Sequence, residues 1–138
     1  MTYTIGDMVE KALERNNLSV TEEKVFVQGD IWLANLEKKA MGHEQGGRRP
    51  VLIISKTEWN DKSKTPICVI CTTSVKKGKN RYTVDLRREN SDKDKHTYAN
   101  GSQLYTLDSG RFIRKVDSAS KGKLLAVKKI VGDLLWVK

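Results

Sequence analysis

Two short apolar runs constrain the fold of this chain most strongly. They are Val51–Ile54 and Ile67–Cys71, and both are rich in β-branched residues that follow one another without polar interruption. Runs of this length between polar segments are typical of strands that are buried on both faces. They therefore predict two central strands of a sheet, and they are too short to cross a bilayer as helices.

Further segments with strand character surround these two runs. Residues 25–27, 31–36, 82–86, 102–107 and 112–116 favour strands, whereas residues 37–49 and 56–64 form polar loops. A C-terminal helix is predicted over 118–135, capped by Ser118 or Ser120, with an apolar stripe of Leu124, Val127, Val131 and Leu134. Short strands with polar connections and few helices predict an α+β, mainly β fold: a small antiparallel sheet curled into a barrel.

The N-terminal segment differs in pattern from the rest. Its apolar residues recur at helical spacing, as Ile5, Met8, Val9, Ala12 and Leu13. A chain of 138 residues has room for one sizeable domain. We therefore expect an N-terminal helical extension at residues 1–23 and the main domain at residues 24–138.

The charge of the chain indicates a polyanionic partner. There are 26 lysines and arginines against 17 acids, which gives a net charge of +9. The excess is uneven: by sequence count residues 1–24 carry −2, residues 76–95 carry +4, and residues 111–138 carry +6. This balance favours nucleic acid ahead of a membrane. The N-terminus also has no basic segment followed by an apolar run, so no signal peptide is expected.

Cys68 and Cys71 form a C-x-x-C pattern inside the second apolar run. Residues three apart on a strand point to opposite faces, so the pattern favours two inert core thiols over a redox pair. No second pair of cysteines completes a zinc site. We therefore expect no metal and no cofactor, and the free thiols suit a reducing cytoplasm.

Three segments could contact phosphate. Gly46 and Gly47 precede two arginines and Pro50, so an arginine fork is held at a strand start. Hydroxyl groups end the second apolar run at residues 72–74, and a basic loop follows at residues 76–81. Taken alone, these could equally be a glycine turn, hydroxyls bonded to their own backbone, and a solvated hairpin.

Together the segments resemble a known family. Gly29-Asp30-Ile31-Trp32, followed by residues 42–53 (GHEQGGRRPVLI), resembles the opening of the MazF/PemK toxins of bacterial type II toxin–antitoxin modules. Residues 71–74 (CTTS) resemble the second block of the family, and residues 102–108 (SQLYTLD) resemble the third. The resemblance covers about residues 24–135.

The resemblance implies an SH3-like curled barrel with a C-terminal helix. It implies a cytoplasmic homodimer that cuts single-stranded RNA, including mRNA, at short sequences without a metal. A cognate antitoxin protein would inhibit it, and the antitoxin complex could in addition bind operator DNA. No membrane partner is implied. Transferred to this chain, the central catalytic pair is Arg49 and Thr73. The expected RNA-binding residues are Gln45, Gly46, Gly47, Arg48, Thr72, Ser74, Lys76, Lys77, Lys79, Arg81 and Gln103.

Cleavage without a metal uses the RNA 2′-hydroxyl as nucleophile and leaves a 2′,3′-cyclic phosphate and a 5′-hydroxyl. Arg49 suits stabilisation of the phosphorane, and Thr73 can donate to a non-bridging oxygen. Some members of the family carry an Arg and an Asp where this chain has Asn100 and Ser102, which are poor bases. His43 is the preferred proton-transfer candidate and Glu44 the second, although His43 could instead contact RNA. His96 is expected to be solvated, and Trp32 is expected in the core, with base stacking as its alternative.

Two other functions stay open at the level of sequence. One is a nucleic-acid-binding barrel with weak or no catalysis, which the residues at 100 and 102 favour. The other is a toxin of the same fold that poisons a protein target. The retained Arg49 and Thr73 favour the endoribonuclease.

Overall fold

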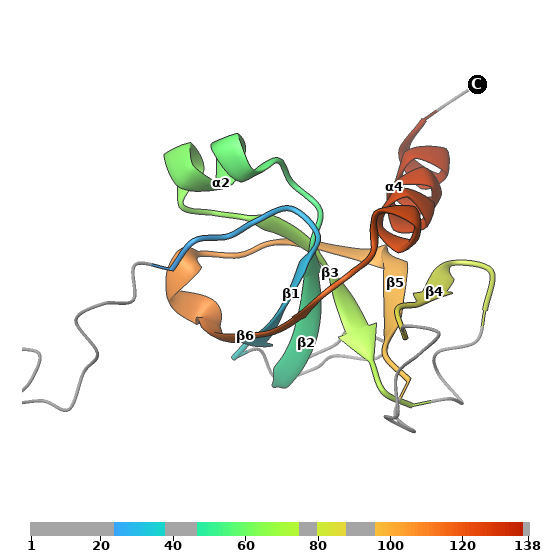
Figure 1. The fold of residues 1–138 in the computed structure, drawn as a ribbon, viewed down its shortest axis with the longest axis horizontal. Helices are drawn as coiled ribbons and strands as arrows, with labels where there is room; N and C mark the ends of the chain where they lie inside the picture. Colours follow the sequence, from blue (N-terminus) through green and yellow to red (C-terminus); the bar gives the residue numbers. More distant parts are fainter. Residues whose placement is uncertain (1–23, 38–46, 75–79, 88–95, 137–138) are drawn as a thin grey trace, which may run out of the picture.

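The computed structural model describes residues 24–37, 47–74, 80–87 and 96–136. Within these residues, one antiparallel sheet has the strand order β4-β5-β3-β2-β1-β6 (Figure 1). Its strands are β1 (Asp30–Asn35), β2 (Arg48–Ile53), β3 (Ile67–Thr72), β4 (Thr83–Asp85), β5 (Tyr98–Thr106) and β6 (Phe112–Ser118). The two apolar runs form β2 and β3 in the middle of the sheet, as predicted.

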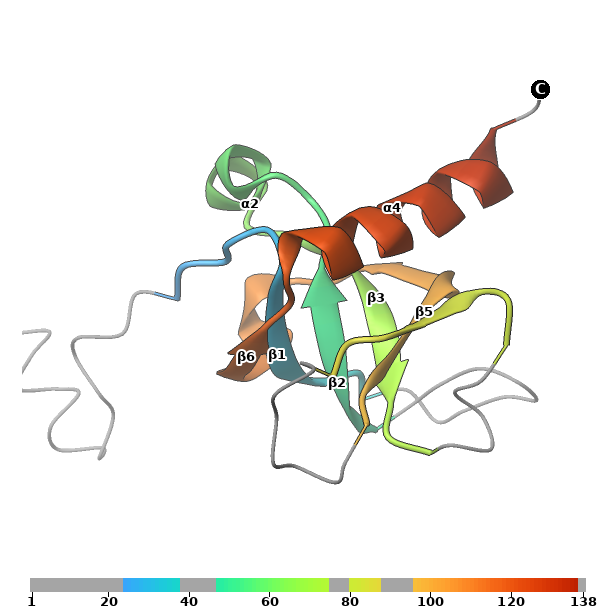
Figure 2. The same ribbon diagram turned by 45° about the vertical axis from the view of Figure 1, so that its right-hand side comes forward.

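In the described part of the chain, three helical segments accompany the sheet: α2 (Thr57–Ser63), the 3-10 turn η1 (Ser109–Arg111) and α4 (Lys121–Leu135). The helix α4 begins after Ser120, whose hydroxyl accepts from the Lys123 amide at 3.3 Å. It packs against β5 and β4 (Figure 2). Its stripe is partly as expected, because Val127 and Val131 are buried while Leu134 is exposed at the far end.

The core has one apolar cluster on each face of the sheet. Trp32, Val51, Ile70 and Phe112 belong to the first cluster, together with Cys68. The second cluster lies under α4 and contains Cys71, with Ile31, Leu52, Val69 and Val127. Both thiols are free and buried, and burial raises the pKa of Cys68 to about 12. The cysteines are therefore on opposite faces and inert, and Trp32 is a core residue.

The sheet bends at irregular pairings. The register of β1 against β6 shifts twice, and the register of β3 against β5 shifts between Val69 and Cys71. At this second shift, Leu104 pairs with Val69 and Ala99 pairs with Cys71. More residues of β5 than of β3 lie between these two pairs, so β5 bulges there. Bulges of this kind increase the local twist and help a sheet to curl.

Several local predictions were wrong. Residues 56–64 are not simply a loop, since they contain α2, and residues 25–27 form no strand, although Phe26 is buried. The predicted loop 37–49 extends too far, because Arg48 and Arg49 already belong to β2. Strand β5 begins at Tyr98 rather than at residue 102. The predicted N-terminal helix lies outside the described residues.

Candidate active site

The start of β2 and the end of β3 meet at one end of the sheet. These strands pair antiparallel, with Val51 opposite Ile70 and Ile53 opposite Cys68. The first residues of β2 and the last residues of β3 therefore lie side by side, at the lower edge of Figure 1. This arrangement places Arg49, Thr72 and Thr73 at or just beyond the same end of the two strands. We call this end of the sheet the arginine end.

The two arginines of β2 point to different faces of the sheet, because successive residues of a strand alternate. Arg49 pairs with the fully buried Ala34 of β1 and is half-buried, on the face of Val51 and the first core cluster. Arg48 pairs with Asn35 and is exposed. Of the two guanidinium groups, only that of Arg49 therefore lies on the face of the first core cluster.

Gly47 sets the entry into β2. Its φ is +74°, in the region that favours glycine, and its carbonyl accepts from the Leu36 amide at 2.9 Å. A Cβ at this position would meet nothing within 4 Å, so the backbone angle, not crowding, is the reason for glycine. The bond to Leu36 closes β1 onto β2 directly before the arginines.

The hydroxyl residues at the end of β3 and just beyond it divide into two kinds. Thr72 is half-buried, and its Oγ1 accepts from the Ser74 amide at 3.2 Å. The backbone-bonded alternative therefore holds for Thr72. Thr73 and Ser74 are exposed beyond the strand end, where a substrate can reach them.

The other predicted RNA-binding residues either lie away from the arginine end or fall outside the described residues. Gln103 lies in the bulged part of β5, between the pairs at Ala99 and Leu104. Arg81 stacks on Tyr82, with its guanidinium carbon 5.0 Å from the ring centre. His43, Glu44, Gln45, Gly46, Lys76, Lys77 and Lys79 lie outside the described residues.

His96 is not simply solvated, and the prediction for it was wrong. Its Nδ1 lies 2.6 Å from Oδ2 of Asp85, and its Nε2 lies 3.2 Å from Nη1 of Arg87. Its ring stacks on Tyr98, with 5.8 Å between the ring centres. Asp85 ends β4 and pairs with Tyr98 of β5, which in turn pairs with Thr72 of β3. The cluster therefore lies two to three strands away from Arg49, at the same end of the sheet.

Asp85 is held in its ionised form. Partial burial alone would raise its pKa, but the Arg87 amide and the His96 side chain both donate to its carboxylate. The positive charge of Lys123 acts in the same direction, so the pKa of Asp85 lies below its ordinary value.

The sequence carried only part of the signal for this cluster. Asp85 lies in the predicted strand 82–86, but the next strand was predicted only from residue 102, which left His96 in the loop between the two. The ten intervening residues, several of them charged, hid the pairing.

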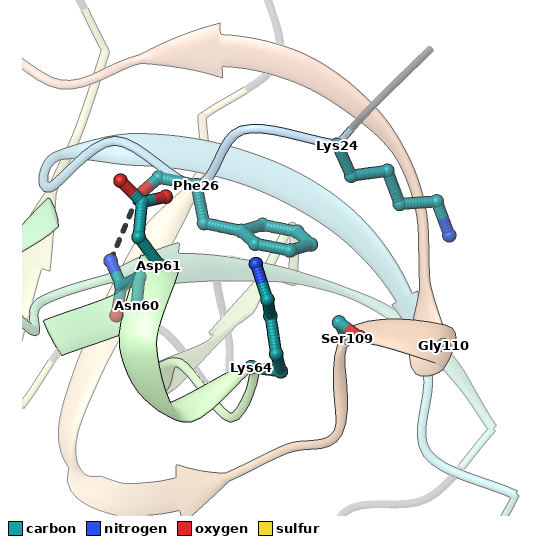
Figure 3. Close-up of a pocket in the computed structure, with 7 residues that line it drawn as sticks. All are labelled: Lys24, Phe26, Asn60, Asp61, Lys64, Ser109 and Gly110. Carbon is teal, nitrogen blue, oxygen red and sulfur yellow. Dashed lines mark hydrogen bonds between the residues drawn. The ribbon is translucent and has the colours of Figure 1, made fainter. Parts of the chain in front are cut away.

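A cavity of about 300 Å³ lies elsewhere, between α2 and η1 (Figure 3). It is lined by Lys24, Phe26, Asn60, Asp61, Lys64, Ser109 and Gly110. Because α2 joins the end of β2 to the start of β3, this cavity is at the opposite end of the sheet from Arg49. We call that end the α2 end.

Within the described residues, no three His, Cys, Asp or Glu side chains are grouped so that they could hold a metal ion. The described helices also include none that is long and apolar enough to span a membrane.

The comparisons with known proteins agree with this arrangement. Residues 27–135 match the profile of the family described as PemK-like, MazF-like toxin of type II toxin-antitoxin system. The chain belongs to this family. It is 34% identical over 100 residues to the endoribonuclease MazF of Staphylococcus epidermidis. The aligned residues make up 72% of this chain and 82% of that relative.

Solved structures of the family share the fold. A crystal structure of MazF from Deinococcus radiodurans matches this chain with a TM-score of 0.70 and 25% identity. The match covers 82% of this chain and 98% of the Deinococcus chain. A MazE–MazF complex from the same organism has a TM-score of 0.65 and 24% identity, with 82% and 97% covered. The predicted family, the mainly β fold and the C-terminal helix are therefore confirmed.

Proposed function

We propose that this MazF-family toxin cleaves single-stranded RNA at the arginine end of the sheet. The 2′-hydroxyl attacks the adjacent phosphorus, the bond to O5′ breaks, and the products carry a 2′,3′-cyclic phosphate and a 5′-hydroxyl. The observation that carries the proposal is the antiparallel β2–β3 pairing, since it brings Arg49 and Thr73 to one strand end.

The chemistry of the two side chains suits this reaction. A guanidinium group offers two parallel donors to a phosphoryl group, and it stays charged as negative charge builds up on the phosphorane. Arg49 is half-buried, so its charge is less screened by water than that of the exposed Arg48. The Thr73 hydroxyl is exposed at the strand end and can donate to a non-bridging oxygen.

The test is cleavage of a long natural mRNA in the presence of EDTA by the wild type and by Arg49→Ala. We expect chelator-resistant cuts with 5′-hydroxyl ends in the wild type, and a rate at least about 100-fold lower in the variant. Arg114→Ala is the matched control, because Arg114 is an exposed arginine on the edge strand β6.

Three outcomes would contradict the proposal. Intact RNA that the wild type nonetheless retains would indicate a binding barrel without catalysis. No interaction with RNA, together with growth arrest on expression, would indicate a protein target. Equal loss of cleavage in Arg49→Ala and Arg114→Ala would remove the special role of the arginine end.

The partners follow from the same proposal. Crystal structures of MazE–MazF complexes are among the structural neighbours, which supports a cognate antitoxin as inhibitor of this chain. We further propose a homodimer in the bacterial cytoplasm, with operator DNA reached through the antitoxin complex. The two buried free thiols suit a reducing compartment.

A further inference from the structure

The cluster of His96 with Asp85, Arg87 and Tyr98 has the geometry of a proton-transfer site. Its side chains come from β4, from β5 and from the residues beside them, at the right of Figure 1. The side chains of His96 and Asp85 are 32% and 35% exposed. The imidazole is therefore held in place on one side and open to solvent on the other.

The contacts of the two ring nitrogens define the form of the imidazole. A guanidinium group has only donors, so Nε2 of His96 accepts from Nη1 of Arg87. The ionised Asp85 has only acceptors, so Nδ1 carries the proton and donates to Oδ2. His96 is therefore a neutral imidazole whose lone pair is on Nε2, which is the form that a general base requires.

The pairing of the strands places this base next to the proposed cleavage site. His96 precedes by two residues the pair of Tyr98 with Thr72, and Thr73 follows that pair by one residue. Because β3 and β5 are antiparallel, both residues leave the same end of the same strand pair. Continuing this register by two residues would set His96 opposite Ser74, the residue after Thr73, so His96 and Thr73 are offset by a single residue across the strand pair.

We propose that His96, positioned by Asp85, is the general base of RNA cleavage, an inference that rests on the function proposed above. Nε2 of His96 takes the proton of the 2′-hydroxyl while O2′ bonds to phosphorus. The P–O5′ bond then breaks, O5′ takes a proton from water, and the resulting hydroxide takes the proton from the imidazolium. Protons and electrons balance, and the enzyme returns to its initial state.

Arg87 has a defined part in this scheme. In the free protein it occupies the lone pair of Nε2. An RNA phosphate is a stronger partner for a guanidinium group than a neutral imidazole is, so RNA would draw Arg87 away and expose the base. Asp85 would hold the ring by Nδ1 while this happens, and Tyr98 would keep its plane.

The charged groups around His96 come from three elements. Asp85 and Arg87 belong to β4 and the residues after it, Tyr98 belongs to β5, and Lys123 of α4 acts on the Asp85 carboxylate. A base must be unprotonated to act. The cleavage rate should therefore fall as the pH is lowered and Nε2 becomes protonated, giving an acid limb that belongs to His96.

The test compares full-length wild type with His96→Gln under single-turnover conditions over a range of pH. The mRNA experiment first locates a cut, and a short oligonucleotide that spans it then serves as substrate. We expect the variant to cleave about 100-fold or more slowly and to lose the acid limb. The affinity of His96→Gln for the same oligonucleotide, made with a 2′-deoxy sugar at the cut, should differ less than threefold from that of the wild type.

Two further variants separate chemistry from structure. Asp85→Asn should keep the ring nearby but remove the charge that fixes the tautomer, so the acid limb should shift. Arg49→Ala should lower the rate at every pH and keep the acid limb. If His96→Gln does not fold, which circular dichroism would show, the acid limb of Asp85→Asn decides the question: an unchanged limb overturns the proposal.

The failure of this inference and the failure of the proposed function look different. If the wild type cuts, Arg49→Ala does not, and His96→Gln cuts within threefold of the wild type with the same pH profile, His96 is not the base. If the wild type does not cut RNA, or if Arg49→Ala cuts normally, the proposed function itself is wrong and this inference falls with it.

Discussion

The two ends of the sheet use polar residues in opposite ways. At the α2 end, Asn60 is 1% exposed, and its Nδ2 donates to the carbonyl oxygens of Phe26 and Ser55 at 2.9 and 3.2 Å. Ser55 donates to Oδ1 of Asn60 and accepts from the Ile67 amide. At the arginine end, Arg49 and His96 are half-buried and Thr73 is exposed. Fully satisfied buried groups specify structure, whereas groups that stay partly exposed can be reached by a substrate.

The largest effect that would test this contrast is expected from Asn60→Ala. The substitution leaves two carbonyl oxygens and the Ser55 hydroxyl with fewer partners in a buried place, so stability should fall by about 4 kcal/mol. Denaturant unfolding measures this loss. The exposed Asp61→Ala on the same helix is the control and should change stability by less than about 0.5 kcal/mol.

The fraction of Asn60→Ala that stays folded should cut RNA at the wild-type rate per folded molecule. A lower rate per folded molecule would mean that the α2 end also takes part in the chemistry, and the contrast between the two ends would not hold.

Thr73→Ala should give the converse result at the arginine end. Loss of a donor to the phosphorane should raise the activation free energy by about 3 kcal/mol, which lowers the single-turnover rate about 100-fold. Stability should hardly change, because Thr73 is exposed beyond β3. The control is Thr106→Ala, an exposed threonine at the other end of the sheet. Equal activity of the two variants would exclude Thr73 from catalysis.

Gly101→Ala should have a smaller effect, on both stability and the cleavage rate. A Cβ on Gly101 would lie 2.5 Å from Cγ2 and 3.1 Å from Cβ of Ile130, so α4 would have to shift away from β5. Overpacking of this kind costs about 2 kcal/mol. Gly122→Ala is the matched control, because a Cβ there meets nothing within 4 Å and alanine favours the helix.

The second readout of Gly101→Ala is the cleavage rate. Gly101 is three residues from Tyr98 along β5, so a shift of the strand should also disturb the ring of His96 and slow cleavage several-fold. Unchanged cleavage with lowered stability would show that packing under α4 and the arginine end are independent.

The central strands and the C-terminal helix were predictable because burial dictates their pattern. β2 and β3 are apolar on both faces, and α4 repeats Val127 and Val131 at helical spacing. The helix α2 was not predictable by the same route. Among its residues only Asn60 is buried, its Trp59 is half-exposed, and its N-cap Lys56 makes no side-chain cap bond. One buried amide specifies this helix, and no periodic pattern marks it.

The candidate site was predictable where it follows the chain and not where it depends on pairing. Arg49 and Thr73 stand next to the central strands in the sequence, and the structure brings them together. Asn100 and Ser102, where some family members have Arg and Asp, bond each other at 2.6 Å. His96 contacts Asp85 only because β4 pairs with β5, and the amino-acid sequence alone does not reveal the register of that pairing.

The bulge in β5 has a consequence for how this toxin can diversify. The strand pairs with β4 and the end of β3 before the bulge, and it resumes regular pairing with β3 at Leu104 after it. A change of length in the β4–β5 connection is therefore absorbed before it reaches the core register. Evolution could therefore change the length of that hairpin while the barrel beneath keeps the same alignment.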